Sequence, residues 1–375
     1  MTFCLVILVI CMVFGYLSQK HSERLVQKSG RSWGADAYGV YAGLECWSVL
    51  LILILVFLCG LRVRYNDTGV YIQSFLQSPT LPALLKQPLP LGDCPGFLCL
   101  QAAVRSLTDN EHLFIMLCAA LCIAPLLVFL KRYSVNFFMS VFLFVTTEQL
   151  LFSLAAIKQA MAIAIAIWAI PLFLQKKYVR AALVVLFAAL FHPYVLLFLL
   201  LPLLTGKPWG IKMVFLMVAV GCVALFFDSF INLALDFALS LGDDYPSDSF
   251  EGTGVNVLRV LVFLVTPLLS LVFFERVRRQ RDRYQHTFVN IATLCFGIMF
   301  LALFGTANLI GRVALYLSFS LALALPYIFS RLEKKSCTAL SGIAMILYFG
   351  YYLYGIRNVT YGMITLEEFF VKLLS

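Results

Sequence analysis

The stretch "AALFHPYVLL", residues 188–197, places one histidine and one proline inside an otherwise unbroken apolar run. Proline cannot continue a helix, and it biases the preceding residue, His192, away from helical geometry. The run over residues 181–204 is therefore predicted to form two short membrane helices that enter the bilayer and return, meeting at "FHP". This hairpin sets the direction in which the later segments cross the membrane.

The composition of the chain is that of a protein embedded in a bilayer. Of its 375 residues, 62% are hydrophobic and 13% are charged, and the mean hydropathy is +0.95. Soluble domains usually carry about a quarter charged residues. The net charge of +9 fits an excess of Lys and Arg in cytoplasmic loops, so it does not indicate nucleic-acid binding.

Apolar runs of membrane-spanning length recur along the whole chain. They predict an all-α, polytopic integral membrane protein with about 11–12 membrane helices, and the absence of internal repeats and linkers predicts one domain over residues 1–375. The first run lacks the basic start and the cleavage site of a signal peptide, so we expect it to be a retained span. The runs cover approximately residues 2–17, 39–60, 112–130, 135–152, 155–174, 181–204, 212–228, 256–274, 287–304, 309–330 and 338–356.

The basic stretches between the runs predict the orientation, because Lys and Arg concentrate on the cytoplasmic side. Without a hairpin at "FHP", the arginine-rich segment "ERVRRQRDRY" (275–284) would be exported, which this bias opposes. With the hairpin, the basic stretches lie inside. Segments 61–111 and 228–256 are then extracytoplasmic, and His192 faces the same side.

The cysteine and histidine pattern indicates no metal site. No group of Cys and His has the spacing of zinc ligands, and no cofactor is predicted, although participation of a divalent cation stays open. Cys94 and Cys99 lie in the first exported segment. Whether they form a disulfide depends on the compartment rather than on their spacing.

Three cations share a position that suggests an anion site. Lys158, Arg259 and Arg312 each fall in the first turn of a span entered from outside, where the partial positive charge of the helix start opposes them. For any one of them, a side chain that reaches the headgroups is the simpler explanation. Together with unpaired N–H groups they describe a site for phosphate. Arg62 and Arg64 add two outside cations.

The motif "RYNDTGVY" (64–71) contains the first candidate for proton transfer. A helix through it would place Arg64, Asp67 or Thr68, and Tyr71 on one face. The simpler interpretation is that Asp67 caps a helix and pairs with a neighbouring arginine. The functional interpretation is that Asp67 accepts a proton from a sugar hydroxyl while Tyr71 contacts the substrate.

His192 is the second candidate, because an imidazole transfers protons near neutral pH. Its simpler interpretation is a neutral ring held by a backbone carbonyl at the kink. Glu45, in "AGLECWS" (42–48), is predicted to lie within a span and to pair with a cation or line a cavity. We expect it to be the one clear charge near the middle of the membrane.

The order of the motifs resembles the EpsG-like family of bacterial polysaccharide polymerases, which are functional relatives of the Wzy O-antigen and capsule polymerases. Each motif is short, so their shared order carries the resemblance, over roughly residues 40–330. The motifs are "GLR" (60–62), "NDTGVYIQSF" (66–75), "IKQAMAIAIA" (157–166), "KKYVRAALVVLFAALFHPYVLLFLL" (176–200) and "GRVALYLSFSLALALPYI" (311–328).

The resemblance implies a glycosyltransferase with the multi-span architecture of lipid-dependent (GT-C-like) enzymes. Such an enzyme would join undecaprenyl-diphosphate-linked oligosaccharide repeat units at the outer face of the bacterial cytoplasmic membrane. Its implied partners are these lipids, membrane lipids, and chain-length regulator and flippase proteins, with no nucleic acid. The site residues it implies are Arg62, Asp67, Tyr71, Gln159, His192 and Arg312.

One position departs from the family pattern. Where the family usually has Arg before Gln, this chain has Lys158. Lysine keeps the charge but lacks the planar guanidinium that binds phosphate through two hydrogen bonds. In the implied reaction, either Asp67 or His192 takes the proton of the acceptor hydroxyl. The cations that would stabilise the leaving diphosphate are Arg62, Arg64, Lys158, Arg259 and Arg312.

Three other functions compete with this one. A membrane acyltransferase for exported glycans would need a histidine-centred motif, and the chain's four histidines form no HxxxD-type pair. A transporter or flippase for lipid-linked oligosaccharides would carry charges near the middle of many spans, and often internal symmetry. A non-catalytic scaffold would leave the outward clustering of cations unexplained.

Overall fold

The helices of this protein form around its apolar runs, as the sequence predicts. The computed structural model describes residues 1–29, 43–86, 94–227, 254–280, 282–304 and 310–374. Within these residues the only extended structure is one pair of short strands, so the predicted all-α, polytopic membrane class is confirmed. Most of the predicted extracytoplasmic segment 228–256, and residues 87–93 of the other, lie outside the described residues.

Five helical segments of the described chain are long and apolar enough to cross a bilayer. A further candidate is a pair of helices, α8 (Phe137–Thr146) and α9 (Gln149–Ala155), that is bent by 52° at a short break. The remaining apolar runs form helices of 10–17 residues, so the predicted count of about 11–12 membrane helices includes pieces shorter than a full crossing. The five segments are Thr2–Lys28, Glu111–Tyr133, Ile157–Leu174, Arg283–Leu301 and Lys334–Ile356.

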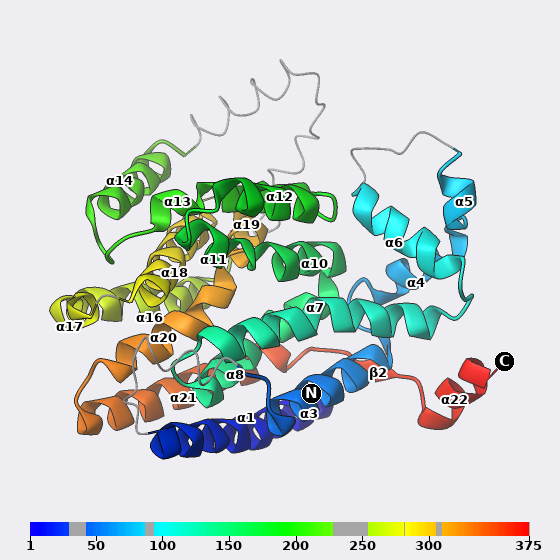
Figure 1. The fold of residues 1–375 in the computed structure, drawn as a ribbon, viewed down its shortest axis with the longest axis horizontal. Helices are drawn as coiled ribbons and strands as arrows, with labels where there is room; N and C mark the ends of the chain where they lie inside the picture. The colour runs from blue at the N-terminus through cyan, green and yellow to red at the C-terminus, as the bar shows by residue number, and fades with distance from the viewer. Residues whose placement is uncertain (30–42, 87–93, 228–253, 281, 305–309, 375) are drawn as a thin grey trace. The chain divides into compact units, whose positions relative to one another are not determined.

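The chain divides into two compact units, Met1–Leu200 with Tyr352–Ser375, and Leu201–Tyr351. Figure 1 labels most helices of both units. The first unit contains α1 (Thr2–Ser29), α3 (Cys46–Gly60), β1 (Arg62–Arg64), α4 (Thr68–Gln77), α5 (Leu81–Leu84), α6 (Pro95–Arg105), α7 (Glu111–Tyr133), α8 (Phe137–Thr146), α9 (Gln149–Ala155), α10 (Ile157–Ala166), α11 (Ala169–Leu174), α12 (Tyr178–Ala189), the 3₁₀ helix η2 (Pro193–Leu200), β2 (Gly362–Met363) and α22 (Leu366–Leu374).

The second unit is built around α18. This helix contacts α14, α16 and α20, and its start is capped by Asp282, whose carboxylate accepts hydrogen bonds from two backbone amides. The elements of this unit are α13 (Leu201–Leu204), α14 (Ile211–Leu225), α16 (Val257–Val272), α17 (Phe274–Arg279), α18 (Arg283–Leu301), α19 (Arg312–Leu315), η5 (Ser318–Ser320), α20 (Leu321–Ser330) and most of α21 (Lys334–Ile356).

The break predicted at "FHP" is present. Helix α12 ends at Ala189, and Pro193 begins η2 after a short turn that contains His192. The two helices pack against each other, so the chain turns back on itself between them. The cause is the one that the sequence indicates, because proline supplies no N–H to continue α12. The side of the membrane that this turn faces stays a prediction.

Helix α7 forms the centre of the first unit, where it contacts α3, α8, α9 and α10 (Figure 1). The side chain of Asn110 caps its start by accepting hydrogen bonds from the N–H groups of His112 at 2.9 Å and Leu113 at 3.2 Å. Gly60 lets α3 approach closely, since a Cβ at that position would lie 2.9 Å from the Cα of Met116. A small residue at this crossing is typical of packed membrane helices.

One buried lysine joins three helices of the first unit. Lys131, on α7, donates to the hydroxyls of Ser18 at 2.7 Å and Ser22 at 2.8 Å, both on α1. Its Nζ also lies 3.6 Å from the carboxylate of Glu45. Buried charges are tolerated when they are paired and hydrogen-bonded in this way.

The expectation that Glu45 lies within a span is wrong. Its carboxylate caps α3, accepting hydrogen bonds from the N–H groups of Trp47 and Ser48 at 2.9 Å each. Ser48 completes a capping box, so α3 begins only at Cys46. One of the roles expected for Glu45, pairing with a cation, is present, because its carboxylate pairs with Lys131.

Replacement of Gly60 by alanine should separate α3 from α7. The added Cβ would meet the backbone of Met116, and overpacking of this kind costs about 1–3 kcal/mol. Thermal unfolding of the purified protein in detergent measures the effect. Gly69→Ala is the matched control, because no atom lies within 4 Å of the Cβ it would add. Equal melting temperatures for the two variants would contradict the close crossing.

Replacement of Lys131 by methionine should destabilise the first unit by about 3 kcal/mol, because the Glu45 carboxylate loses its cation. The adjacent Arg132 is exposed, so Arg132→Met should change stability by less than about 0.5 kcal/mol. Unfolding of both variants under the same detergent conditions compares them. A Lys131→Met protein as stable as Arg132→Met would show that the network is dispensable.

Candidate functional site

The first turn of α6 is fixed against the end of α12 by a glycine. The N–H of Gly96 donates a hydrogen bond of 2.8 Å to the carbonyl of Leu190. A Cβ on Gly96 would lie 2.9 Å from the Cβ of Leu190 and 3.1 Å from its carbonyl oxygen, so a larger residue does not fit. Cys94, with a φ of 56°, and Pro95 turn the chain into the helix.

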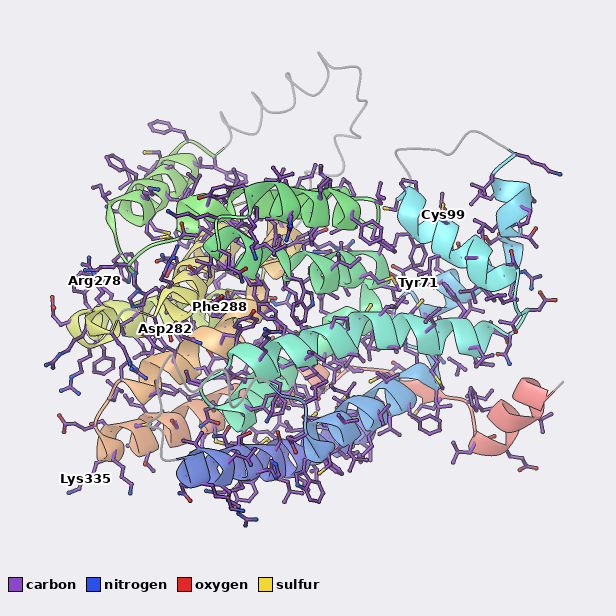
Figure 2. The ribbon with its side chains drawn as sticks, viewed as in Figure 1. Tyr71, Cys99, Arg278, Asp282, Phe288 and Lys335 are labelled. Atoms are coloured by element: carbon purple, nitrogen blue, oxygen red, sulfur yellow. The ribbon has the colours of Figure 1, made fainter. Side chains whose placement is uncertain are left out.

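The ring of Phe97, the next residue, lies between two of the predicted site residues. Tyr71 meets it edge-on, with ring centroids 5.8 Å apart, and the Nζ of Lys158 lies 5.4 Å from its centroid. Phe97 itself is fully buried. Residues from α4, α6 and α10 are thus held around one aromatic ring, and Figure 2 shows Tyr71 beside the helix that carries Cys99.

The hydroxyl of Tyr71 lies near the start of α10. Burial, and after it the carboxylate of Asp67, raise the pKa of the Tyr71 phenol to about 12, while the backbone amides of Lys158 and Ile157 act in the opposite direction. At neutral pH the phenol is therefore protonated, which makes it a hydrogen-bond donor rather than a base.

Lys158 lies in the first turn of a helix, as predicted. Helix α9 ends at Ala155, the backbone of Ala156 leaves helical geometry with φ −104° and ψ 67°, and α10 begins at Ile157. The Lys158 side chain is half-buried, whereas its neighbour Gln159 is buried. The two predicted residues therefore differ in their access to a ligand.

Asp67 immediately precedes α4 but does not cap it through its side chain. It is exposed, and its carbonyl accepts a hydrogen bond of 3.0 Å from the N–H of Tyr71 one turn later. The capping role that the simpler interpretation assigned to its carboxylate is thus absent. The carboxylate is available on the side of α4 where its charge acts on Tyr71.

The expectation of one helical face through Arg64, Asp67 and Tyr71 is wrong. Arg64 belongs to strand β1, which pairs antiparallel with β2, so that Arg64 lies opposite Gly362. Asn66, with a φ of 41°, turns the chain between the strand and α4. The strand forms because a partner segment some 300 residues away reaches it, which the local periodicity could not show.

Arg62, the first residue of β1, is fully buried. Its Nη1 donates to the carbonyl of Cys59 at 2.8 Å, and its Nε donates to the hydroxyl of Thr68 at 3.3 Å. Its Nη2 is buried without a hydrogen-bond partner. This arrangement holds the connection between α3 and α4 and does not bring the guanidinium to the surface near Tyr71 and Lys158.

His192 follows Leu190, the residue that contacts Gly96, by two positions. Two residues of chain span at most about 7 Å, so its backbone is close to the start of α6. The imidazole is half-buried and lies 5.3 Å, between ring centroids, from the ring of Tyr194. The first turn of α6 therefore contacts both segments that carry a candidate base. Phe97 packs against Tyr71, one turn after Asp67. Gly96 bonds to Leu190, two residues before His192.

The other two predicted cations belong to the second unit. Arg259 is in the first turn of α16, as expected, and its Nε lies 3.4 Å from the hydroxyl of Tyr351. Arg312 is exposed and begins α19, a helix of only four residues, because the apolar run that follows is broken into α19, η5 and α20.

Sequence reasoning missed Glu148, which lies at the bend between α8 and α9. Its backbone is in the left-handed region, with a φ of 63°, and its charge raises the pKa of Tyr65 further after the larger effect of burial. A Cβ on Gly355 would overlap its carboxylate. The signal was the polar sequence "TTEQ" (146–149) inside the run 135–152.

The described part of the chain contains no cluster of metal-ligand side chains. There, no three side chains among His, Cys, Asp and Glu come together in a way that could hold a metal ion. Cys94 and Cys99 are both free thiols.

Comparison with known proteins identifies the family. The family described as EpsG matches residues 46–370, which is most of the chain. No curated protein and no solved structure matches it significantly. The family match supports a polymerase-like role in polysaccharide biosynthesis for this multi-pass membrane protein. The chain belongs to the EpsG family of Wzy-type polysaccharide polymerase-like proteins.

Proposed function

We propose that this protein joins undecaprenyl-diphosphate-linked oligosaccharide repeat units into a surface polysaccharide. The reaction would take place at the outer face of the bacterial cytoplasmic membrane. The observation that carries the proposal is the convergence of Lys158 and Tyr71 on the Phe97 ring. The hydrogen bond between Gly96 and Leu190 holds the segment that contains His192 against the same turn of α6.

The reaction needs a group that stabilises the negative charge that develops on the leaving diphosphate. A hydroxyl of the acceptor sugar attacks the anomeric carbon of the donor, and the bond between that carbon and the diphosphate oxygen breaks. Lys158 supplies a positive charge in the first turn of α10. Tyr71, protonated at neutral pH, supplies a neutral donor. Such preorganised donors lower the barrier most where water is scarce.

The reaction also needs a group that takes the proton of the attacking hydroxyl. Asp67 is exposed and carries no capping hydrogen bond, so its carboxylate is accessible to a substrate. His192 lies at the helix break and is half-buried. We propose that one of the two is the general base, with the other close enough to orient the acceptor.

Loss of the Lys158 charge should impair polymerisation. In a strain without the gene, the wild-type gene should restore a long glycan ladder, while Lys158→Ala should lower the rate of chain growth by about 100-fold or more, as for loss of one charge-stabilising donor. Lys158→Arg should retain activity, because it keeps the charge and offers two donors to phosphate. Gel analysis of surface glycan and of lipid-linked intermediates measures the chain length.

Arg180→Ala is the control for Lys158→Ala. Arg180 is an exposed cation on α12 of the same unit, so its loss changes the net charge equally but leaves the Phe97 cluster intact. Long ladders from Lys158→Ala, at normal protein abundance, would refute the assigned role of Lys158.

Removal of the general base should leave single lipid-linked repeats in place of long chains. We expect either Asp67→Asn or His192→Gln to slow polymerisation by at least about 100-fold, the usual contribution of a positioned base. His21→Gln, on α1, is the control. Normal chain lengths in both site variants would contradict the assignment.

A further inference from the structure

The second unit contains an apolar groove between α16 and α21. Its volume is about 480 Å³, within the range of ligand pockets in proteins. Its floor includes the buried residues Val262 and Ala344, and its rim includes the exposed residues Leu261 and Leu347. The groove is therefore open along one side and presents hydrocarbon surface to an occupant.

The length of the groove matches one leaflet of a bilayer. On α16 it extends from Leu258 to Leu269, and on α21 from Leu340 to Tyr351. At the rise of an α-helix, each of these stretches is about 16 Å long. The hydrocarbon core of a bilayer is about 30 Å thick, so the groove covers the stretch of a lipid chain that lies within one leaflet.

A cation lies at one end of the groove. Arg259 is adjacent to Leu258 in the first turn of α16, and its Nε lies 3.4 Å from the hydroxyl of Tyr351. Tyr348, one turn before Tyr351, donates a hydrogen bond of 3.1 Å to the carbonyl of Val262. These two contacts join α21 to α16 at the end where Arg259 lies, while the groove continues toward Leu269.

We propose that this groove holds the part of a lipid-linked substrate's polyprenyl chain that is nearest its phosphate, with the phosphate end of that lipid at Arg259. The inference rests on the proposed function for the identity of the lipid. The groove itself favours a single long chain with one anionic end, because its lining is apolar and the cation Arg259 lies at one end of it. A phospholipid would have to place its second acyl chain outside.

Two glycines of α21 provide a matched pair of variants. Gly350 lines the groove and Gly342 does not, and neither has any atom within 4 Å of the Cβ that a substitution would add. Both lie within the same helix, where phenylalanine is a better helix former than glycine. Gly350→Phe should place a ring in the groove, and Gly342→Phe should add the same ring elsewhere on the helix.

The test measures binding of undecaprenyl phosphate to the purified full-length protein in detergent, by native mass spectrometry and by the shift of its melting temperature. We expect wild type and Gly342→Phe to bind alike, and Gly350→Phe to bind at least tenfold more weakly with an unchanged melting temperature in the absence of lipid. Arg259→Gln should weaken binding of undecaprenyl phosphate but leave binding of uncharged undecaprenol unchanged.

Two results would overturn the proposal. One is equal binding by Gly350→Phe and Gly342→Phe. The other is displacement of the probe by equimolar phosphatidylglycerol, which would identify the groove as an ordinary bilayer-lipid site. Binding by a protein that fails to polymerise repeat units would sink the proposed function but not the groove. Normal polymerisation by a protein that does not bind undecaprenyl phosphate selectively would sink the groove proposal but not the proposed function.

Discussion

The close contact between the first turn of α6 and the end of α12 is the interaction on which the candidate site depends. It requires the absence of a side chain at Gly96, because a Cβ there would lie 2.9 Å from the Cβ of Leu190 and 3.1 Å from its carbonyl oxygen. With that contact in place, the next residue, Phe97, meets Tyr71 and Lys158. Segments far apart in the sequence therefore share one small region of the first unit.

The charges of the first unit serve two different purposes. Lys131 and Arg62 are buried, and they are used to hold helices and turns through serine hydroxyls, carbonyls and Glu45. Lys158 is half-buried at the start of α10. At 4 Å from an opposite charge, a cation gains about 1 kcal/mol in water and about 4 kcal/mol at the boundary of a protein. Partial burial thus favours Lys158 over a fully exposed cation as a phosphate ligand.

Local sequence rules predicted the features that depend on local chemistry. Pro193 indicated the break after α12, and the apolar runs indicated the helices and placed Lys158 and Arg259 in first turns. These rules failed where a segment distant in the sequence determines the secondary structure. Arg64 is in a strand because Gly362 pairs with it.

The remaining misses have physical reasons as well. Glu45 was read as lying within a span because the apolar run around it is continuous, whereas its own capping bonds begin the helix after it. Glu148 was overlooked since hydropathy averages a single acid into its apolar neighbours.

The central claim is that this chain itself catalyses the joining of lipid-linked repeat units. Reconstitution of the purified protein into vesicles with one undecaprenyl-diphosphate-linked repeat unit, and no other protein, tests it most directly. The account predicts a ladder of lipid-linked oligomers together with release of undecaprenyl diphosphate, one molecule for each bond formed. Unchanged monomeric substrate, with a folded protein in the vesicles, would contradict it.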